Sequence, residues 1–487
     1  MRATTRPILA AFLTVLAAVA SVAAPARAAR GAAPVWKPCA EDATVQCASL
    51  KVPVDWAAPY GPSIQVAVAR RPAADPKNRI GTLLVNPGGP GGSGVDFTLD
   101  STSYFSPELR KRFDIVGFDP RGVSRSNPIV CTTTLLTAAP PITIDTAAQY
   151  TTAVAYNRRL ADDCAEQTGP LFGHVDTLSI VRDTEALRAA LGEDKISFYG
   201  ASYGTLLGEQ YAARYPQRIR ALVLDSVMDH SRDIDGFLSA EALAVQGSFD
   251  QFVRWCDRST ECAVHGRDVR KLWDGLLASA RRGTLKDPYS PTYKLSVYEL
   301  TNVAFGSFYD PQWHSLGIFI KEAVAGVAGK RARAVVDVSE HIFPAAFCDD
   351  WVVPVTGYAD LRSRMARAAG RAPQMGFSPL ALSSVNGCLG WTRGTSNPQV
   401  RLPTARTGPV LLVNARYDPA TPHVWARNVA AQLGPKASLL TYEGWGHTVY
   451  GRSDCINAVV DRYLLTLKPA ATGASCPAIE PKAAGVG

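Results

Sequence analysis

The stretch FYGASYGT, residues 198–205, places Ser202 between Gly200 and Gly204. The apolar run KISFY, residues 195–199, leads into this stretch. The residues from Thr205 onward, TLLGEQYAARYP, have the composition of a helix. The pattern is G-x-S-x-G, in which a serine stands on a sharp turn from a strand into a helix. Glycines suit both flanks because larger side chains would collide with the backbone there. We predict that Ser202 is a nucleophile on such an elbow, and not an ordinary serine in a glycine-rich turn.

Short apolar runs elsewhere in the chain predict a sheet around this elbow. We expect seven segments to be strands, because most of them are short apolar runs rich in Val, Leu and Ile that are closed by a turn signal: 64–72, 81–89, 113–122, 195–202, 221–227, 408–419 and 437–447. Nearly continuous apolar runs are typical of strands covered on both faces of a mostly parallel sheet. Segment 179–192 has helical spacing between two of them. The alternation predicts a doubly wound α/β fold.

The alternation stops in the middle of the chain. With 487 residues the protein exceeds one ordinary domain. Segments 242–256 and 316–329 have helical patterns, and no run in this part reads convincingly as a buried strand. We therefore expect a helical lid at 229–402 inserted into an α/β core. The predicted organisation is a core in two parts, 29–228 and 403–476, with a flexible tail at 477–487.

Residues 1–28 have the features of a secretory signal peptide. Arg2 and Arg6 precede the apolar stretch 8–20, and Ala26-Arg27-Ala28 supplies small residues for cleavage. The stretch is too short to span a bilayer, so we expect a secreted protein with no membrane attachment after cleavage. Without residues 1–28 and their three arginines the formal net charge falls from +8 to about +5. No clustered basic stripe is present, so the composition does not favour nucleic-acid binding.

Ten cysteines are consistent with export, because disulfides persist in oxidising compartments. Their order suggests pairing between neighbours, although other pairings remain open. The suggested pairs are Cys39–Cys47, Cys131–Cys164, Cys256–Cys262, Cys348–Cys388 and Cys455–Cys476. A zinc site is the alternative, but no pair has C-x-x-C spacing and no H-E-x-x-H occurs. We expect no metal and no cofactor.

A serine nucleophile needs a base and an acid that orients the base. His447 follows the last predicted strand, in EGWGHTVY, where glycines can bend the loop toward the sheet edge. Asp418 ends the preceding strand in ARYDPATP. Asp225 is a rival acid, because it also ends a predicted strand. We favour Asp418, which gives the order Ser, Asp, His that accompanies G-x-S-x-G.

The glycine-rich segment NPGGPGGSG, residues 86–94, directly follows a predicted strand. It formally contains G-x-G-x-x-G, so a dinucleotide-binding loop has to be considered. An exported chain with a nucleophile, base and acid has a better use for it, as a loop that turns a backbone N–H toward a developing oxyanion. We expect the amides of Gly91 and Tyr203 to be the donors, with Gly92 in reserve.

Five segments together resemble one family: NPGGPGGSG, FDPRGVSRS (118–126), YGASYGT, YDPATP and GWGHT. They are similar to the secreted α/β-hydrolase exopeptidases of the prolyl aminopeptidase and tripeptidyl aminopeptidase family, over about residues 52–476. The resemblance implies an α/β-hydrolase fold and a peptidase that acts at free N-termini through Ser202, Asp418 and His447. Asn86 stands where prolyl aminopeptidases usually carry a histidine, which favours the tripeptidyl branch.

An exopeptidase needs a reason to prefer a chain end. A buried lid carboxylate that pairs with the α-ammonium of the substrate would supply it. The candidates are Asp349, Asp350, Glu340 and Glu241. We expect peptide substrates with free N-termini and a monomeric enzyme. The alternatives are an esterase or lipase on the same fold, and a non-catalytic binding protein on a hydrolase scaffold; epoxide and halide hydrolases need a carboxylate where this chain has Ser202.

Overall fold

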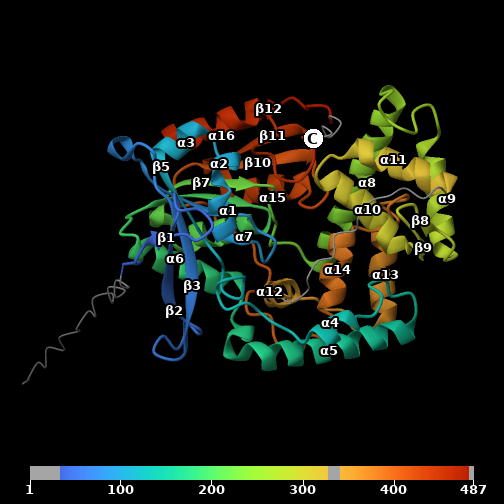
Figure 1. Cartoon of the computed structure of the whole chain (residues 1–487), viewed down its shortest axis with the longest axis horizontal. Helices are drawn as coiled ribbons and strands as arrows, with labels where there is room; N and C mark the ends of the chain where they lie inside the picture. Colours follow the sequence, from blue (N-terminus) through green and yellow to red (C-terminus); the bar gives the residue numbers. More distant parts are fainter. Residues whose placement is uncertain (1–32, 327–340, 482–487) are drawn as a thin grey trace, which may run out of the picture.

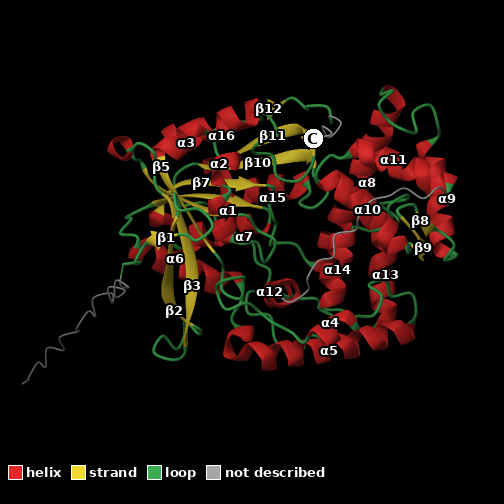
Figure 2. Cartoon of the chain, viewed as in Figure 1, coloured by secondary structure: helices red, strands yellow, loops and turns green. Residues whose placement is uncertain are grey.

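The computed structural model describes residues 33–326 and 341–481, so the predicted signal peptide lies outside the described residues. A central sheet runs through the left half of the view in Figures 1 and 2. Its ten strands have the order β1-β2-β3-β5-β4-β6-β7-β10-β11-β12. They are β1 Lys37–Pro38, β2 Gln46–Pro53, β3 Ser63–Arg71, β4 Gly81–Asn86, β5 Phe113–Phe118, β6 Ile196–Ala201, β7 Ile219–Asp225, β10 Val410–Tyr417, β11 Ala437–Trp445 and β12 Ser475–Cys476.

The sheet is antiparallel at one edge and parallel elsewhere. Strand β1 pairs with β2, β2 with β3 and β3 with β5 in antiparallel orientation, and the remaining pairings in this sheet are parallel. All seven predicted strands are present. Strands β1, β2 and β12 were not predicted, because β1 and β12 have two residues each and β2 mixes polar and apolar residues at the sheet edge.

Helices cover both faces of the sheet, as the continuous apolar runs require. Along β4, Leu83 and Val85 pack with one group of helices and Leu84 with another. The first face carries α1 Gly94–Leu99, α2 Ser101–Tyr104, α3 Pro107–Arg112 and α16 Asp454–Thr466, and the second carries α6 Thr177–Ala190, α7 Tyr203–Arg214 and α15 His423–Leu433. The predicted doubly wound α/β fold is confirmed. Short 3-10 helices are Pro76–Asn78, Gly169–Gly173, Pro216–Arg218 and Gly434–Lys436.

The segment predicted as the lid forms the right half of the view in Figure 1. Its described part is helical apart from one hairpin. The elements are α8 Ile234–Arg258, α9 Val269–Arg281, β8 Lys286–Asp287, β9 Ser290–Lys294, α10 Val297–Tyr309, α11 Trp313–Ala325, α12 Ile342–Asp350, α13 Tyr358–Ala369 and α14 Pro379–Gly387. The limits that we predicted for the lid, residues 229 and 402, both lie in loops.

One long helix from the predicted N-terminal core also lies against the lid helices. Figure 1 shows α5 Ala147–Thr168, which follows the short α4 Thr133–Thr137, running below α14 and α13. Asn157 on α5 donates side-chain hydrogen bonds to the main-chain oxygens of Asn386 and Leu389, at 2.7 and 2.9 Å. The lid helices therefore pack against α5, which belongs to the segment between β5 and β6 and not to the predicted lid.

Five disulfides join the cysteines in the five neighbouring pairs that the sequence suggested. One of them, Cys348–Cys388, ties α12 to the end of α14 within the lid. At the chain end, Cys455–Cys476 holds β12 beside α16. The described residues of the predicted tail are in contact with the core, since the Ile479 amide donates to the Tyr442 hydroxyl. Within residues 33–326 and 341–481, no helix is long and apolar enough to cross a membrane.

Candidate active site

The candidate nucleophile stands on the predicted turn between a strand and a helix. Ser202 follows β6 directly and precedes α7, with φ +56° and ψ −127°. A positive φ is costly for a residue with a side chain and is retained mainly where function requires it. A Cβ at Gly200 would lie 2.3 Å from the main-chain oxygen of Gly204, and a Cβ at Gly204 would lie 2.5 Å from Oδ1 of Asn86. The elbow therefore requires both glycines.

The candidate acid and base are in contact. Asp418 directly follows β10, and its Oδ1 lies 3.0 Å from Nδ1 of His447. The same carboxylate accepts hydrogen bonds from the amides of Ala420 and Thr421, both at 2.9 Å. Burial alone would raise the pKa of Asp418, but the imidazole and these donors bring its pKa below the ordinary value. Asp418 is therefore an anion that can orient His447.

The rival acid has a different place. Asp225, at the end of β7, accepts hydrogen bonds from the amides of Val449 and Tyr450, each at 2.9 Å, and from the Tyr199 hydroxyl at 2.7 Å. These amides belong to the chain that follows His447. Asp225 therefore holds the histidine loop by its backbone, while Asp418 contacts the imidazole itself.

Ser202 and His447 have a common neighbour in the lid. The Tyr309 ring lies 4.4 Å from the His447 ring, centroid to centroid. Burial raises the pKa of Tyr309, whereas a side-chain hydrogen bond with Ser202 lowers it; the net shift is upward, so the phenol stays protonated. Nε2 of His447 is buried and has no hydrogen-bond partner among the described residues. Catalytic hydrogen bonds often tighten only when substrate binds. We expect the same of the hydrogen bond between Ser202 and Nε2 of His447.

The glycine-rich loop packs directly on the elbow. A Cβ at Gly88 would lie 2.8 Å from the amide nitrogen of Tyr203, and the buried Asn86 side chain accepts a hydrogen bond from the Gly88 amide at 2.9 Å. The Gly92 amide, which we named as a further candidate donor to the oxyanion, donates instead to the Gly88 oxygen at 2.8 Å. No hydrogen bond from the amides of Gly91 or Tyr203 is found within the described part of the chain. These two amides stay candidates for the oxyanion hole.

Among the four lid carboxylates, Asp350 is fully engaged by the protein. It is completely buried, on α12, and accepts four hydrogen bonds. The donors are the Thr177 amide (2.9 Å), the Thr177 hydroxyl (2.6 Å), the Tyr203 hydroxyl (2.7 Å) and the Asn397 side chain (2.7 Å). An ammonium group would have to displace one of them. Asp350 fits a role in fastening the lid to the elbow helix better than the amine site that we predicted.

Asp349 lies on α12 beside Asp350, and the main charges that act on its carboxyl group are those of Asp176, Asp350 and Arg393. Burial, with further contributions from the charges of Asp176 and Asp350, raises the pKa of Asp349 to about 8. Its carboxyl group is therefore mostly protonated near pH 7, and its Oδ2 is buried without a partner among the described residues. Glu340 lies outside the described residues.

Glu241 is the remaining candidate. It lies on α8 with 1% of its surface exposed, and the Ser378 hydroxyl donates to its Oε2 at 2.5 Å. Burial raises the pKa of Glu241, and the charge of Asp418 raises it further. Glu241 in turn raises the pKa of Tyr309. The carboxyl group therefore lies within electrostatic reach of both the Asp418–His447 pair and the tyrosine beside Ser202.

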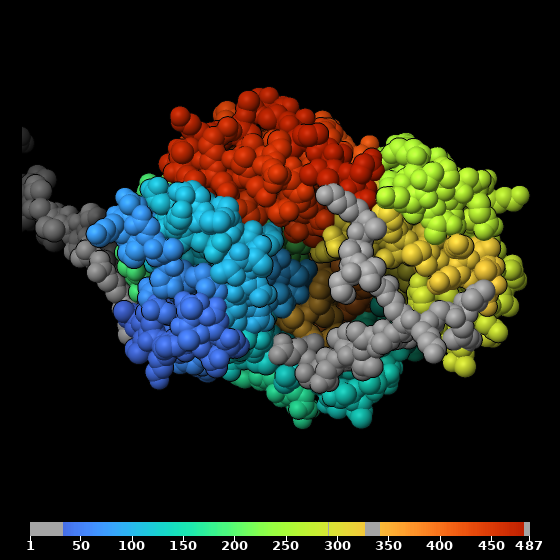
Figure 3. Space-filling model, turned by 45° about the horizontal axis from the view of Figure 1, so that its top comes forward, coloured from blue at the N-terminus to red at the C-terminus, as the bar shows by residue number. Residues whose placement is uncertain are grey.

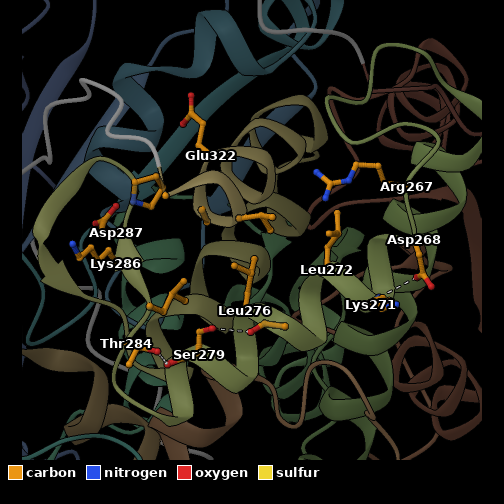
Figure 4. A pocket seen from close by; sticks show the side chains of 16 residues that line it. Arg267, Asp268, Lys271, Leu272, Leu276, Ser279, Thr284, Lys286, Asp287 and Glu322 are labelled. Atoms are coloured by element: carbon orange, nitrogen blue, oxygen red, sulfur yellow. Dashed lines mark hydrogen bonds between the residues drawn. The ribbon is translucent and has the colours of Figure 1, made fainter.

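One cavity lies beside the candidate catalytic residues, and another lies elsewhere in the lid. A small one beside the elbow is lined by Gly91, Tyr203 and Asp350 among others. A much larger one, about 720 Å³, lies at the outer end of the lid between α9, α11 and β8, and Figure 4 shows Glu322, Lys271 and Lys286 around it. It contains none of the candidate catalytic residues. The space-filling view also shows a recess where the blue N-terminal part, the red C-terminal part and the gold part of the lid meet (Figure 3).

Most of this chain is similar to curated proteins. It is 31% identical to "Serine protease Hip1" of Mycobacterium tuberculosis over 464 residues, which cover 88% of this chain and 87% of that protein. The chain belongs to the TAP-like family of α/β-hydrolase serine peptidases. The TAP-like family model matches residues 372–476. This membership confirms the resemblance that the sequence motifs indicated.

Two further relatives differ in their names. The chain is 30% identical to "Tripeptidyl aminopeptidase" of Streptomyces lividans, over 94% of this chain and 88% of that protein. It is 32% identical to "Carboxylesterase B" of Mycobacterium tuberculosis, over 88% of this chain and 85% of that protein. At similar identity, the chain thus resembles one protein named as a peptidase and one named as an esterase. Five disulfides indicate that this member is exported.

Two neighbours of the candidate triad were missed by the sequence analysis. Thr421 lies three residues after Asp418, and its hydroxyl is 2.9 Å from Asp418 and 3.3 Å from Nδ1 of His447. The position after a strand-end aspartate could have indicated it, since side-chain hydroxyls often cap such turns. Tyr309 had no signal of this kind, because its place beside Ser202 depends on how the lid is packed.

Proposed function

We propose that this TAP-like serine peptidase releases short peptides, chiefly tripeptides, from the free N-termini of peptide substrates. The observation that carries the proposal is Glu241, a buried lid carboxyl group with a single hydroxyl partner in the described chain, within reach of the Asp418–His447 pair. A buried carboxyl group that lacks a cation is costly unless a ligand or a proton neutralises it. The α-ammonium of a peptide is such a ligand.

The proposed mechanism uses the geometry of the elbow. His447 takes the proton of Ser202 as the serine oxygen attacks the scissile carbonyl, and Asp418 stabilises the imidazolium. The amides of Gly91 and Tyr203 hold the oxyanion. The protonated histidine then gives its proton to the leaving amine, and water hydrolyses the acyl-enzyme on Ser202.

The amine site accounts for exopeptidase action. If Glu241 pairs with the α-ammonium, the fixed path from Glu241 to Ser202 sets how many residues lie on the acyl side of the scissile bond. Internal stretches of a protein chain have no α-ammonium group and gain nothing from this contact. The proposal also includes removal of residues 1–28, release of the enzyme from the cell and action as a monomer.

The test is a digest of one defined decapeptide, in free and N-acetylated forms, followed by mass spectrometry. Loss of N-terminal tripeptides from the free form alone supports the proposal, and Ser202→Ala should abolish it. Cleavage of both forms would contradict the need for a free amine. Release of single residues would contradict the tripeptidyl specificity.

An esterase is the second candidate function, because one relative is named Carboxylesterase B. An acyl-enzyme on serine can form from an ester as well as from an amide. Comparing a tripeptide anilide with a nitrophenyl ester of similar size separates the two. An ester rate with no peptide or anilide cleavage would favour the esterase.

A further inference from the structure

One arginine joins the candidate catalytic histidine to the lid. Arg452, in the loop before α16, donates from Nε to the Thr448 oxygen at 2.5 Å and from Nη2 to the His447 oxygen at 2.9 Å. The same guanidinium reaches the end of lid helix α10, where it donates to the Tyr309 oxygen at 3.3 Å and pairs with Asp310 at 3.0 Å. Four acceptors from two distant segments therefore converge on one side chain.

The backbone of the histidine is fastened to the lid a second time. The His447 amide donates to the Tyr309 oxygen at 2.8 Å. The next amide, that of Thr448, donates to the Ser226 hydroxyl of the core at 2.8 Å. Ser226 and Thr448 have φ values of +61° and +59°, which are unfavourable for residues with side chains. Such backbone persists only where the surroundings determine it, and here both the core and the lid contribute.

A glycine makes the close approach possible. Gly446 has φ +96°, and a Cβ there would lie 3.0 Å from Cζ of Arg452 and 3.1 Å from Cδ of Pro311. The guanidinium and the lid turn therefore press on the backbone directly before the histidine. An arginine suits this place because its planar head presents five N–H donors in a fixed geometry, which the single ammonium of a lysine does not.

We propose that Arg452 is a positioning residue for His447 and that the lid, through Tyr309 and Asp310, supplies part of the support for the catalytic base. The inference rests on the proposed function, in which His447 activates Ser202. It makes the lid a component of the catalytic apparatus in addition to a cover. Loss of the clamp should displace the imidazole, and a displacement of about 1 Å can lower a rate by about 100-fold.

The experiment compares Arg452→Met, Arg452→Lys and Asp310→Asn with the wild-type enzyme. The measurements are kcat and KM on a tripeptide anilide, the rate at which a sulfonyl fluoride labels Ser202, and the thermal unfolding midpoint. Arg452→Met should lower kcat and the labelling rate together by about 10- to 100-fold, with KM changed by less than about threefold. Arg452→Lys should recover only part of the loss. Asp310→Asn should give a smaller loss of the same kind, of about threefold to tenfold.

Arg416→Met is the matched control, because Arg416 pairs with Glu443 at 2.8 Å on the protein surface and makes no hydrogen bond or ion pair with residues 446–452 within the described chain. It should leave kcat and labelling unchanged. Asp310 is 66% exposed, so Asp310→Asn provides a test even if Arg452→Met does not fold.

Two results would overturn the inference by itself. One is a lower unfolding midpoint in Arg452→Met or Asp310→Asn with kcat and labelling within twofold of wild type. The other is a change in KM alone, which would indicate a substrate contact. If the wild-type enzyme is not labelled at Ser202 at all, the proposed function fails and the inference fails with it, so the two failures are distinguishable.

Discussion

Asp418 and His447 lie 29 residues apart in the chain, and in the fold the carboxylate oxygen of one is 3.0 Å from Nδ1 of the other. The contact arises because β10 and β11 are parallel neighbours, so the loops that follow them meet at the same edge of the sheet. Strand β6 ends at this edge as well, with Ser202 directly after it. The relationship supports an arrangement in which Ser202 is the nucleophile, His447 the base and Asp418 the acid.

Replacement of the nucleophile should abolish catalysis without unfolding the protein. Ser202→Ala is expected to lower kcat by about a thousandfold or more. The methyl group fits the elbow, so the thermal unfolding midpoint should change little. Ser103→Ala, at an exposed position of α2, is the control and should retain wild-type kcat. Substantial hydrolysis by Ser202→Ala would exclude Ser202 as the nucleophile.

The two strand-end aspartates should give opposite patterns when each is changed to asparagine. Asp418→Asn is expected to lower kcat by about 10⁴-fold, because the amide no longer stabilises the imidazolium. Asp225→Asn places an NH2 group against the Val449 or Tyr450 amide, so it should cost about 1–3 kcal/mol of unfolding free energy. Urea unfolding and kcat measured on both variants check this. A loss of activity only in Asp225→Asn would reverse the assignment of the acid.

Two lid carboxyl groups should differ in their effect on substrate binding. Glu241→Gln is expected to raise KM for free tripeptide anilides by about 10- to 100-fold, because a hydrogen bond to a charged group is worth about 1.5–3 kcal/mol. It should not alter hydrolysis of N-acetylated esters. Asp349→Asn is the matched control and should leave KM unchanged. An increase in KM for Asp349→Asn alone would move the amine site to α12.

Stability should depend on pH through Asp349. Burial and the neighbouring aspartates raise its pKa from 3.8 to about 8, so between these values the folded state holds one proton more than the unfolded state. The free energy of unfolding therefore falls as the pH rises from about 4 to about 8, on the order of 1 kcal/mol per pH unit from this group.

Urea unfolding of the wild type and of Asp349→Asn across this pH range checks the prediction. The difference in stability between the two proteins should be smallest near pH 4, where the carboxyl is protonated in the folded state and still partly protonated in the unfolded state. The advantage of the variant should increase toward pH 8. A difference that is constant with pH would contradict the raised pKa.

The disulfide that closes the longer loop should contribute more to the free energy of unfolding. Cys348–Cys388 spans 40 residues and Cys256–Cys262 spans 6. Closing a longer loop removes more conformational entropy from the unfolded chain, so the first pair should contribute about 4 kcal/mol and the second about 2 kcal/mol. Unfolding of the two double Cys→Ser variants measures both losses. An equal loss would indicate that contacts of the folded state, and not the unfolded chain, determine the contribution.

The sequence predicted what depends on local pattern. The seven predicted strands are present, and most of them are short apolar runs of the kind that suits a strand buried on both faces; β3 differs, since its buried residues alternate with exposed ones along its first half. The strand-to-helix turn at Ser202 was readable from two glycines. Strand β2 was missed because Leu50 and Val52 are the only Val, Leu or Ile residues among its eight, which is too few for a recognisable apolar run.

The surroundings of the lid carboxylates could not be predicted from local sequence pattern. Asp349 and Asp350 are adjacent in the sequence, yet Asp350 receives four hydrogen bonds, while Oδ2 of Asp349 has no hydrogen-bond partner in the described chain. Their surroundings come from α6, the elbow helix and the loop after α14, and no spacing in the sequence reveals that. The same holds for the choice between Asp418 and Asp225, which both end strands.

The sequence by itself determined seven of the ten strands of the central sheet, the elbow at Ser202 and the order of Ser202, Asp418 and His447, because backbone preference and apolar burial act between residues that are close in the chain. Only the tertiary structure decided that Asp418 contacts the imidazole, that Tyr309 lies against it and that Arg452 ties it to the lid. Hydrogen bonds and ion pairs form wherever the packing of helices and strands brings two groups within about 3 Å, and that packing is a property of the whole chain.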